Sequence, residues 1–167
     1  MRIYLVRHAE SVERAGEMPD AYRHLSARGR VSFRETARKA GEEAIRPARI
    51  FTSPYVRAVQ TAEILAERIG YEGEVAAVAQ LGPGFDLGKL RVILDTAPDD
   101  AELAMVGHEP DLGAVLTQLL SLPRPYAMRK GAMAAIDLPG SGNRPGARLA
   151  WLLEGERKIS DATGLLR

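Results

Sequence analysis

Short apolar runs recur along the chain, and each is bounded by polar or turn-forming residues. Runs of this length and composition are typical of strands buried inside a sheet. We expect strands over residues 2–6, 48–52, 74–78, 103–106, 132–138 and 148–153. The last two runs flank a segment rich in glycine and proline, residues 139–146, which predicts a turn.

Longer segments between these runs repeat apolar residues at intervals of three and four, the pattern of a helix with one buried face. We expect helices over residues 26–45, 53–70, 87–94 and 111–120. Ser26 and Ser53 are the predicted N-caps of the first two helices, because serine caps helices well and Pro54 suits a first helical position. The predicted buried face of the second helix consists of Val56, Val59, Ala62, Ala66 and Ile69.

Alternating strands and helices predict an α/β fold in which a mostly parallel sheet is covered on both faces. We therefore expect a single three-layer α/β/α domain over residues 1–167, with about six strands and an antiparallel element near the C-terminus. Residues 9–25 lack a regular pattern and predict a long surface loop. Loops of that length in compact domains are commonly functional.

Composition narrows the functional classes. Hydrophobic residues make up 46% of the chain and charged residues 27%, the balance of a globular protein. With 23 basic and 22 acidic residues, the net charge of +1 gives no reason to expect a nucleic-acid partner. The absence of cysteine excludes thiolate catalysis. No apolar stretch approaches the roughly 20 residues that span a bilayer, so we expect no membrane association and a cytoplasmic location.

Basic and imidazole side chains follow three of the predicted strands. Arg7 and His8 come directly after the first strand. Arg57 follows the second strand, in the first turn of the next helix, and His108 follows the fourth strand. Taken singly, each could be a solvated residue at a strand end. Because ligands bind at the carboxyl ends of strands in open α/β sheets, the four together predict a site for phosphoryl transfer, which depends on positioning and charge neutralisation.

The two histidines supply a route to covalent catalysis. A neutral imidazole, with a reference pKa of about 6.5, is a nucleophile near pH 7, and its attack on phosphorus gives a phosphoramidate that water can hydrolyse. A second, protonated imidazole would hold the phosphoryl oxygens without magnesium, so we expect no cofactor and no metal. His24 fits no compact zinc-ligand spacing with the other histidines.

Three blocks of the sequence resemble those of the histidine phosphatase superfamily, also called the phosphoglycerate mutase-like family. The blocks are Arg-His-Ala at residues 7–9, Ser-Pro-Tyr-Val-Arg-Ala-Val-Gln-Thr-Ala at residues 53–62 and Val-Gly-His-Glu-Pro at residues 106–110. The short chain and the segment at residues 23–29 are most similar to the SixA type of phosphohistidine phosphatase. The resemblance implies that His8 is the nucleophile and that Arg7, Arg57 and His108 form the phosphate pocket.

Two positions depart from the family pattern. Ala9 stands where the family has glycine, and Gln80 lies in the segment where mutase-like members carry an acidic glutamate. A missing proton donor favours N–P over O–P cleavage, because an alkoxide leaving group needs protonation more than imidazole does. Glu109 and Asp86 are the candidate general acids. An equal alternative for Glu109 is a structural role, as a charge that complements the dipole of the following helix.

The resemblance implies a phosphatase that acts through a phosphohistidine enzyme intermediate, with phosphohistidine on a signalling protein as the expected substrate. Two alternatives remain open. One is a phosphomonoesterase for a small phosphorylated metabolite, such as a sugar or nucleotide phosphate, and the other is a phosphate-binding module without turnover. The expected partner is therefore a phosphorylated protein or a small phosphorylated metabolite. We expect the loops over residues 10–25 and 81–86 to set specificity.

Overall fold

The computed structural model describes residues 1–139 and 146–166. Within them, seven strands form one sheet in the order β3-β2-β4-β1-β5-β6-β7. The strands are β1 (Arg2–Arg7), β2 (Arg49–Thr52), β3 (Val75–Ala77), β4 (Glu102–Gly107), β5 (Met133–Asp137), β6 (Arg148–Glu154) and β7 (Arg157–Ile159). The first four strands run parallel, whereas each of β5, β6 and β7 is antiparallel to the strand before it in the sheet. The α/β class is therefore confirmed.

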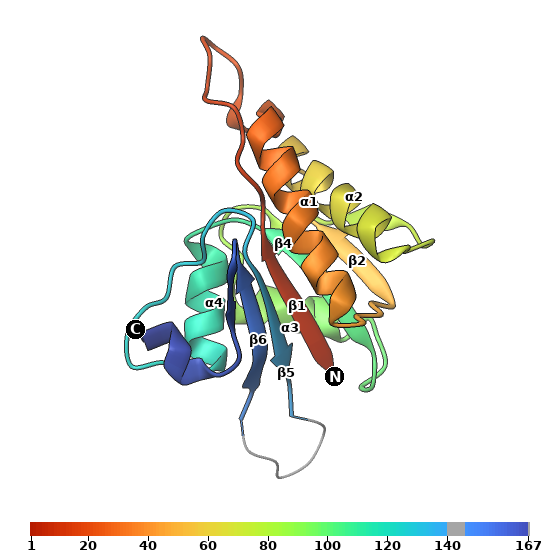
Figure 1. Ribbon diagram of the computed structural model, residues 1–167, viewed down its shortest axis with the longest axis vertical. Helices are drawn as coiled ribbons and strands as arrows, with labels where there is room; N and C mark the ends of the chain where they lie inside the picture. The colour runs from red at the N-terminus through yellow and green to blue at the C-terminus, as the bar shows by residue number, and fades with distance from the viewer. Residues whose placement is uncertain (140–145, 167) are drawn as a thin grey trace.

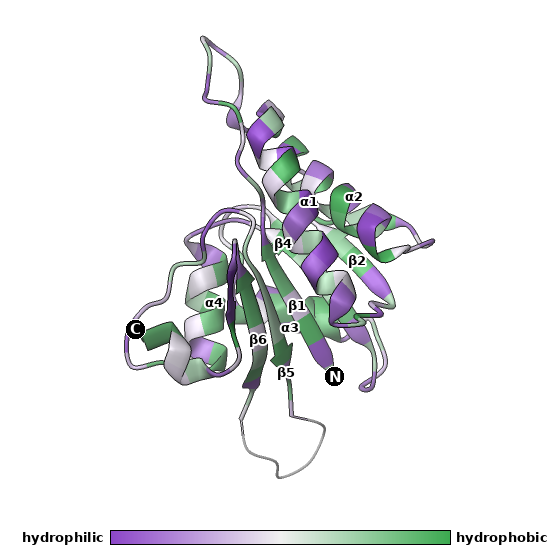
Figure 2. Ribbon diagram, viewed as in Figure 1, coloured by the Kyte–Doolittle hydropathy of each residue, from purple (hydrophilic) through white to green (hydrophobic). Residues whose placement is uncertain are grey.

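Helices cover both faces of this sheet (Figure 1). They are α1 (Ala27–Glu42), α2 (Val56–Ile69), α3 (Leu87–Leu94) and α4 (Asp111–Leu119). On β1, Tyr4 and Val6 pack with α1 and α2, and the alternate residues Ile3 and Leu5 pack with α3 and α4. Period-two alternation of a strand thus builds two cores, one on each face. Figure 2 shows apolar strands between helices whose outward faces are polar.

No helix in the described part of the chain has both the length and the apolar character needed to cross a membrane. The turn predicted at residues 139–146 lies mostly outside the described residues, which omit 140–145. Strand β7 was not predicted, because it is only three residues long and Arg157 and Lys158 are exposed, so it shows no apolar run.

The predicted helix starts have different outcomes. Ser26 caps α1 as expected, and its Oγ accepts a hydrogen bond from the Gly29 N–H at 3.0 Å. The prediction for Ser53 was wrong, because α2 begins at Val56 with Tyr55 in the capping position. The Ser53 hydroxyl accepts the Tyr55 N–H at 3.2 Å and lies 2.7 Å from the His108 ring. The Ser53 hydroxyl therefore contacts the His108 ring instead of capping α2.

The buried face of α2 matches the predicted one only in part, because Ala62 and Ala66 are buried as expected but the face is rotated away from the predicted valines. Val56 and Val59 are half-buried, whereas Ala58, Thr61 and Leu65 are fully buried. The apolar spacing alone could not reveal this rotation, because Thr61 is polar and Ala58 is small. The rotation turns the neighbouring Arg57 inward, where its side chain is buried despite its charge.

Candidate active site

Pairing between β1 and β4 brings the first and third sequence blocks together. The two strands are parallel neighbours, and Arg7 lies opposite Gly107 in their register. His8 and His108 are the next residues after these two strands, so they lie at the same edge of the sheet, with ring centroids 5.2 Å apart. The backbone of His8 is held on both sides, since its N–H donates to the Gly107 carbonyl and its carbonyl accepts from the Gly131 N–H, each at 3.1 Å.

The hydrogen bonds of His8 define which ring nitrogen can react. Its Nδ1 lies 2.7 Å from the Ala9 carbonyl oxygen. Because a carbonyl only accepts, Nδ1 carries the ring proton and Nε2 keeps a free lone pair. That lone pair accepts the Nε–H of Arg57 at 3.2 Å. The structure therefore holds His8 as the tautomer that a nucleophilic Nε2 requires.

Both imidazoles are held in their neutral forms. Burial is the main cause that lowers the pKa of His8 to about 3, and the nearby charges of His108, Arg57 and Arg7 lower it further. Burial is also the main cause that lowers the pKa of His108 to about 4, followed by the charge of Arg57. Near pH 7 each ring therefore has a nitrogen with an unprotonated lone pair. The positive charge that attracts an anion to the site comes from Arg7 and Arg57.

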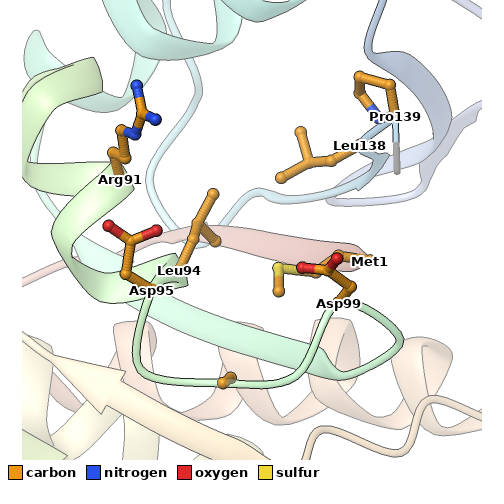
Figure 3. A pocket seen from close by; sticks show the side chains of 8 residues that line it. Met1, Arg91, Leu94, Asp95, Asp99, Leu138 and Pro139 are labelled. Atoms are coloured by element: carbon orange, nitrogen blue, oxygen red, sulfur yellow. The ribbon is translucent and has the colours of Figure 1, made fainter. Parts of the chain in front are cut away.

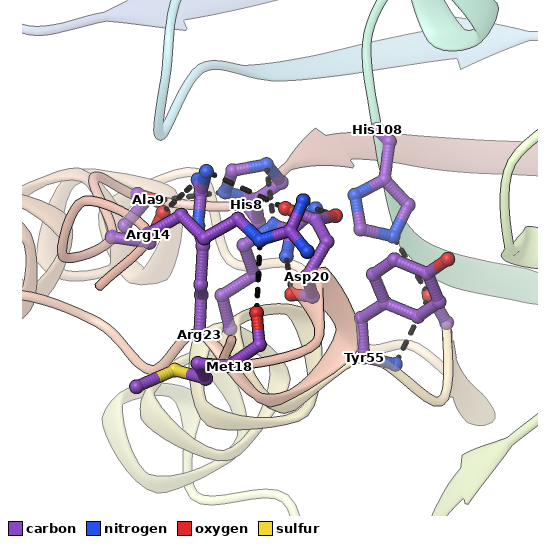
Figure 4. A network of polar contacts seen from close by, with 11 residues as sticks. His8, Ala9, Arg14, Met18, Asp20, Arg23, Tyr55 and His108 are labelled. Carbon is purple, nitrogen blue, oxygen red and sulfur yellow. Dashed lines mark hydrogen bonds and ion pairs between the residues drawn. The ribbon is translucent and has the colours of Figure 1, made fainter. Parts of the chain in front are cut away.

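His108 presents one ring nitrogen toward His8 (Figure 4). Its Nε2 bonds Ser53 Oγ at 2.7 Å, whereas its Nδ1 is buried and has no hydrogen-bond partner. If the Ser53 hydroxyl donates to Nε2, the ring proton sits on Nδ1 and faces His8. A buried polar atom without a partner is uncommon in folded proteins and marks a place where a ligand atom can bond. The ring of Tyr55 packs edge-on against His108, with centroids 4.9 Å apart.

The two arginines approach from different elements. Arg57, in the first turn of α2, donates Nη1–H to the backbone carbonyl of Asp20 at 2.7 Å and pairs Nη2 with the Asp20 carboxylate at 2.8 Å. Arg7, at the end of β1, donates Nη1–H to the Met128 carbonyl at 2.6 Å. The Arg7 Nε is buried without a partner. All four predicted residues are thus brought to one edge of the sheet.

Both candidate general acids accept a hydrogen bond from a backbone N–H. Glu109 accepts the Met128 N–H at 3.3 Å, so the Met128 peptide is held between Glu109 and Arg7. Burial raises the pKa of the Glu109 carboxyl, and the Arg7 charge opposes that shift. Asp86 is exposed and caps α3 by accepting the Lys89 N–H at 2.8 Å. Gln80 lies in the short 3₁₀ turn Ala79–Leu81.

Two residues that contact the predicted site residues, Asp20 and Thr61, were missed in the sequence, and His24 lies outside the site. Asp20, in the loop before α1, was not predicted, because a single aspartate in an irregular segment has no recognisable pattern. Thr61 accepts the Ala9 N–H at 3.1 Å and donates to the Arg57 carbonyl at 2.7 Å, linking the first two blocks. Its presence within the second block was a signal that could have found it. His24 is exposed and contacts the Leu25 carbonyl through Nδ1.

A separate hollow of about 390 Å³ lies at the opposite end of the sheet, beside the start of β1 (Figure 3). Its charged lining residues are Arg91, Asp95 and Asp99. Two carboxylates against one guanidinium are a poor match for a phosphoryl dianion. The strand-end cluster is therefore the better candidate for the active site.

Comparison with known proteins places this arrangement in a family. Residues 3–81 match the family model of the histidine phosphatase superfamily (branch 1). An uncharacterised protein of Picosynechococcus is 36% identical over 116 residues, which cover 68% of this chain and 69% of that protein. Phosphohistidine phosphatase SixA of Escherichia coli is 24% identical over 145 residues, which cover 86% of this chain and 89% of SixA.

The fold agrees with these sequence matches. A solved structure of SixA in complex with tungstate resembles this chain with a TM-score of 0.81 at 23% identity, covering 93% of this chain and 97% of the other. This chain belongs to the histidine phosphatase superfamily, branch 1, and its activity class is that of a phosphatase.

Proposed function

We propose that the protein is a cofactor-independent phosphatase that forms a phosphohistidine intermediate on His8 and that its substrate is phosphohistidine on a signalling protein. The observation that carries this proposal is the state of His8: a buried neutral ring whose Nε2 lone pair faces the Nε–H of Arg57. A free lone pair beside a fixed cation is what attack on a phosphoryl group requires.

In the first step, the Nε2 lone pair of His8 forms a bond to phosphorus while the bond from phosphorus to the leaving imidazole breaks. The electron pair of that broken bond stays on the leaving nitrogen. Because the substrate ring carries a proton on its other nitrogen, it departs as neutral imidazole without a proton from the enzyme. Arg57 and Arg7 neutralise charge on the phosphoryl oxygens, and the unpartnered Nδ1 of His108 is placed to donate to one of them. Water then forms a bond to phosphorus while the bond from phosphorus to Nε2 breaks. The electron pair of that bond returns to Nε2, and the oxygen and protons of the water leave with inorganic phosphate or pass to solvent.

The surroundings of the candidate acids support an N–P substrate. Gln80 cannot supply a proton, Asp86 is engaged in capping α3, and Glu109 is engaged with the Met128 N–H. An alkoxide leaving group would need a proton from one of them, whereas imidazole is a far better leaving group. The relative named phosphohistidine phosphatase, SixA of Escherichia coli, supports the same substrate class.

Turnover of two substrates tests the proposal. The wild-type protein should hydrolyse a phosphohistidine peptide faster than p-nitrophenyl phosphate. His8→Ala should lose at least about a hundredfold of that activity, since the nucleophile is removed. His24→Ala is the matched control, because His24 is exposed and outside the cluster, and it should keep wild-type rates. Faster turnover of the ester would instead support the phosphomonoesterase, and no turnover of either would support a phosphate-binding module.

A further inference from the structure

One residue occupies the whole outer edge of the Arg57 guanidinium. Asp20 accepts Nη1–H through its backbone carbonyl at 2.7 Å and Nη2–H through its carboxylate at 2.8 Å. The third nitrogen, Nε, bonds His8. These three bonds use three of the five N–H groups of the guanidinium and occupy both terminal nitrogens on the edge that faces Asp20. Arginine binds a phosphoryl group best with two parallel N–H groups, and Asp20 holds the parallel pair formed by Nη1 and Nη2.

We infer that Asp20 competes with the phosphoryl group for Arg57, so that substrate or product phosphate gains the parallel Nη1–H and Nη2–H pair only by displacing it. This inference rests on the proposed function, in which Arg57 holds the phosphoryl oxygens. The Asp20 carboxylate makes with Arg57 the same kind of charge-assisted hydrogen bond that an anionic phosphoryl oxygen would make. The hydrogen bond from Arg57 also lowers the pKa of Asp20, so the competing group is ionised near pH 7.

The loop that carries Asp20 gives the displaced carboxylate a second partner. Arg23 Nη1 lies 3.4 Å from the other Asp20 oxygen, and Arg23 Nη2 is fixed by donating to Ser11 Oγ at 2.8 Å. Figure 4 shows Asp20 and Arg23 in the polar network beside His8. The Asp20 side chain is 46% exposed, so water can also reach it. When the Asp20 carboxylate moves away from Arg57, its charge is therefore not left buried without a partner.

The competition lowers the affinity for every anion that uses Arg57 alone. When inorganic phosphate binds, only the contacts of its own oxygens compensate for the broken Asp20–Arg57 hydrogen bonds. A phosphorylated protein makes further contacts with the loop at residues 10–25, and these offset the same loss. The displacement costs both ligands the same free energy, so Asp20 leaves the product phosphate with a low affinity while a large substrate still binds through its other contacts.

Binding of inorganic phosphate to variants tests this inference without turnover. Isothermal titration of Asp20→Asn should give a dissociation constant about tenfold lower than that of wild type, because the competing charge is removed while the side chain keeps its size. Asp20→Ala should bind at least as tightly. Glu17→Gln is the matched control: it removes the same charge from an exposed position in the same loop and should bind as wild type does. Thermal unfolding of each variant checks that it is folded.

Unchanged or weaker phosphate binding by both Asp20 variants would overturn the inference, because Asp20 would then orient Arg57 instead of competing for it. So would an equal gain of affinity in Glu17→Gln, which would indicate a general charge effect. The outcome is separable from the proposed function. Tighter phosphate binding by the Asp20 variants without any hydrolysis would support the competition and refute the phosphatase mechanism. Hydrolysis through His8 with unaltered phosphate affinity would support the phosphatase mechanism and refute the competition.

Discussion

At the scale of single residues, the reactivity of the site depends on where the ring protons lie. The Ala9 carbonyl fixes the proton of His8 on Nδ1, and Ser53 occupies the Nε2 of His108. Neither contact could be predicted from the sequence. The alanine at position 9 leaves the carbonyl in reach of the ring, and its side chain is buried, so the departure from the family's glycine is accommodated.

The low pKa values of the two histidines predict a pH-dependent stability. They lie at about 3 for His8 and about 4 for His108, below the value of about 6.5 in an unfolded chain. As pH falls below the unfolded value, the unfolded chain takes up protons that the folded protein does not. The free energy of unfolding therefore decreases toward acid pH.

Urea unfolding in phosphate-free buffer measures this effect. Between pH 7.5 and pH 5, the wild-type protein should lose about 4 kcal/mol more stability than the double variant His8→Asn/His108→Asn, about 2 kcal/mol for each titrating ring that the variant lacks. Equal losses in the two proteins would show that the rings are not held neutral by the fold.

At the scale of elements, the strands, one helix cap and the four main site residues were predictable, whereas the contacts that support the site were not. The apolar runs of β1 and β4 and the Ser26 cap of α1 follow from local pattern alone. Ser53 has the same capping signal as Ser26, but a contact with His108, more than fifty residues away in sequence, takes its hydroxyl. The four main site residues were predictable because strand ends meet at one edge, whereas Asp20 reaches the site from a loop that has no pattern.

Close packing between α1 and the preceding loop gives an element-scale prediction. A Cβ added at Gly29 would lie 2.1 Å from the Glu10 carbonyl oxygen, which accepts the Ser26 N–H. Gly29→Ala should therefore destabilise the protein by about 1–3 kcal/mol, although alanine is the better helix former. The measurement is urea unfolding at neutral pH.

Gly41 in the same helix is the control, because a Cβ there would meet only the Arg68 carbonyl oxygen, at 3.9 Å. Gly41→Ala should stabilise the protein by about 0.5–1 kcal/mol. A stabilising effect of Gly29→Ala would mean that the loop and the helix are not in close contact.

At the scale of the whole molecule, the site exists because of sheet order. Strand β4 lies between β2 and β1, so the ends of three strands that are far apart in sequence become neighbours. The parallel part of the sheet brings their carboxyl ends together, as ligand sites in open α/β sheets require. The antiparallel strands β5 and β6 extend the sheet away from the site, and the segment before β5 contributes the Met128 carbonyl that holds Arg7.

The neighbouring strand ends place His8 beside Arg57 and His108, and from this we propose a covalent phosphoryl intermediate on His8. The most direct measurement is to mix the protein with a phosphohistidine peptide, quench within the first turnover and locate the phosphoryl group by mass spectrometry. The account predicts an acid-labile phosphoryl group on His8 in the wild-type protein and in His24→Ala, and none in His8→Ala. Hydrolysis without any phosphorylated His8, or a phosphoryl group that persists in His8→Ala, would contradict it.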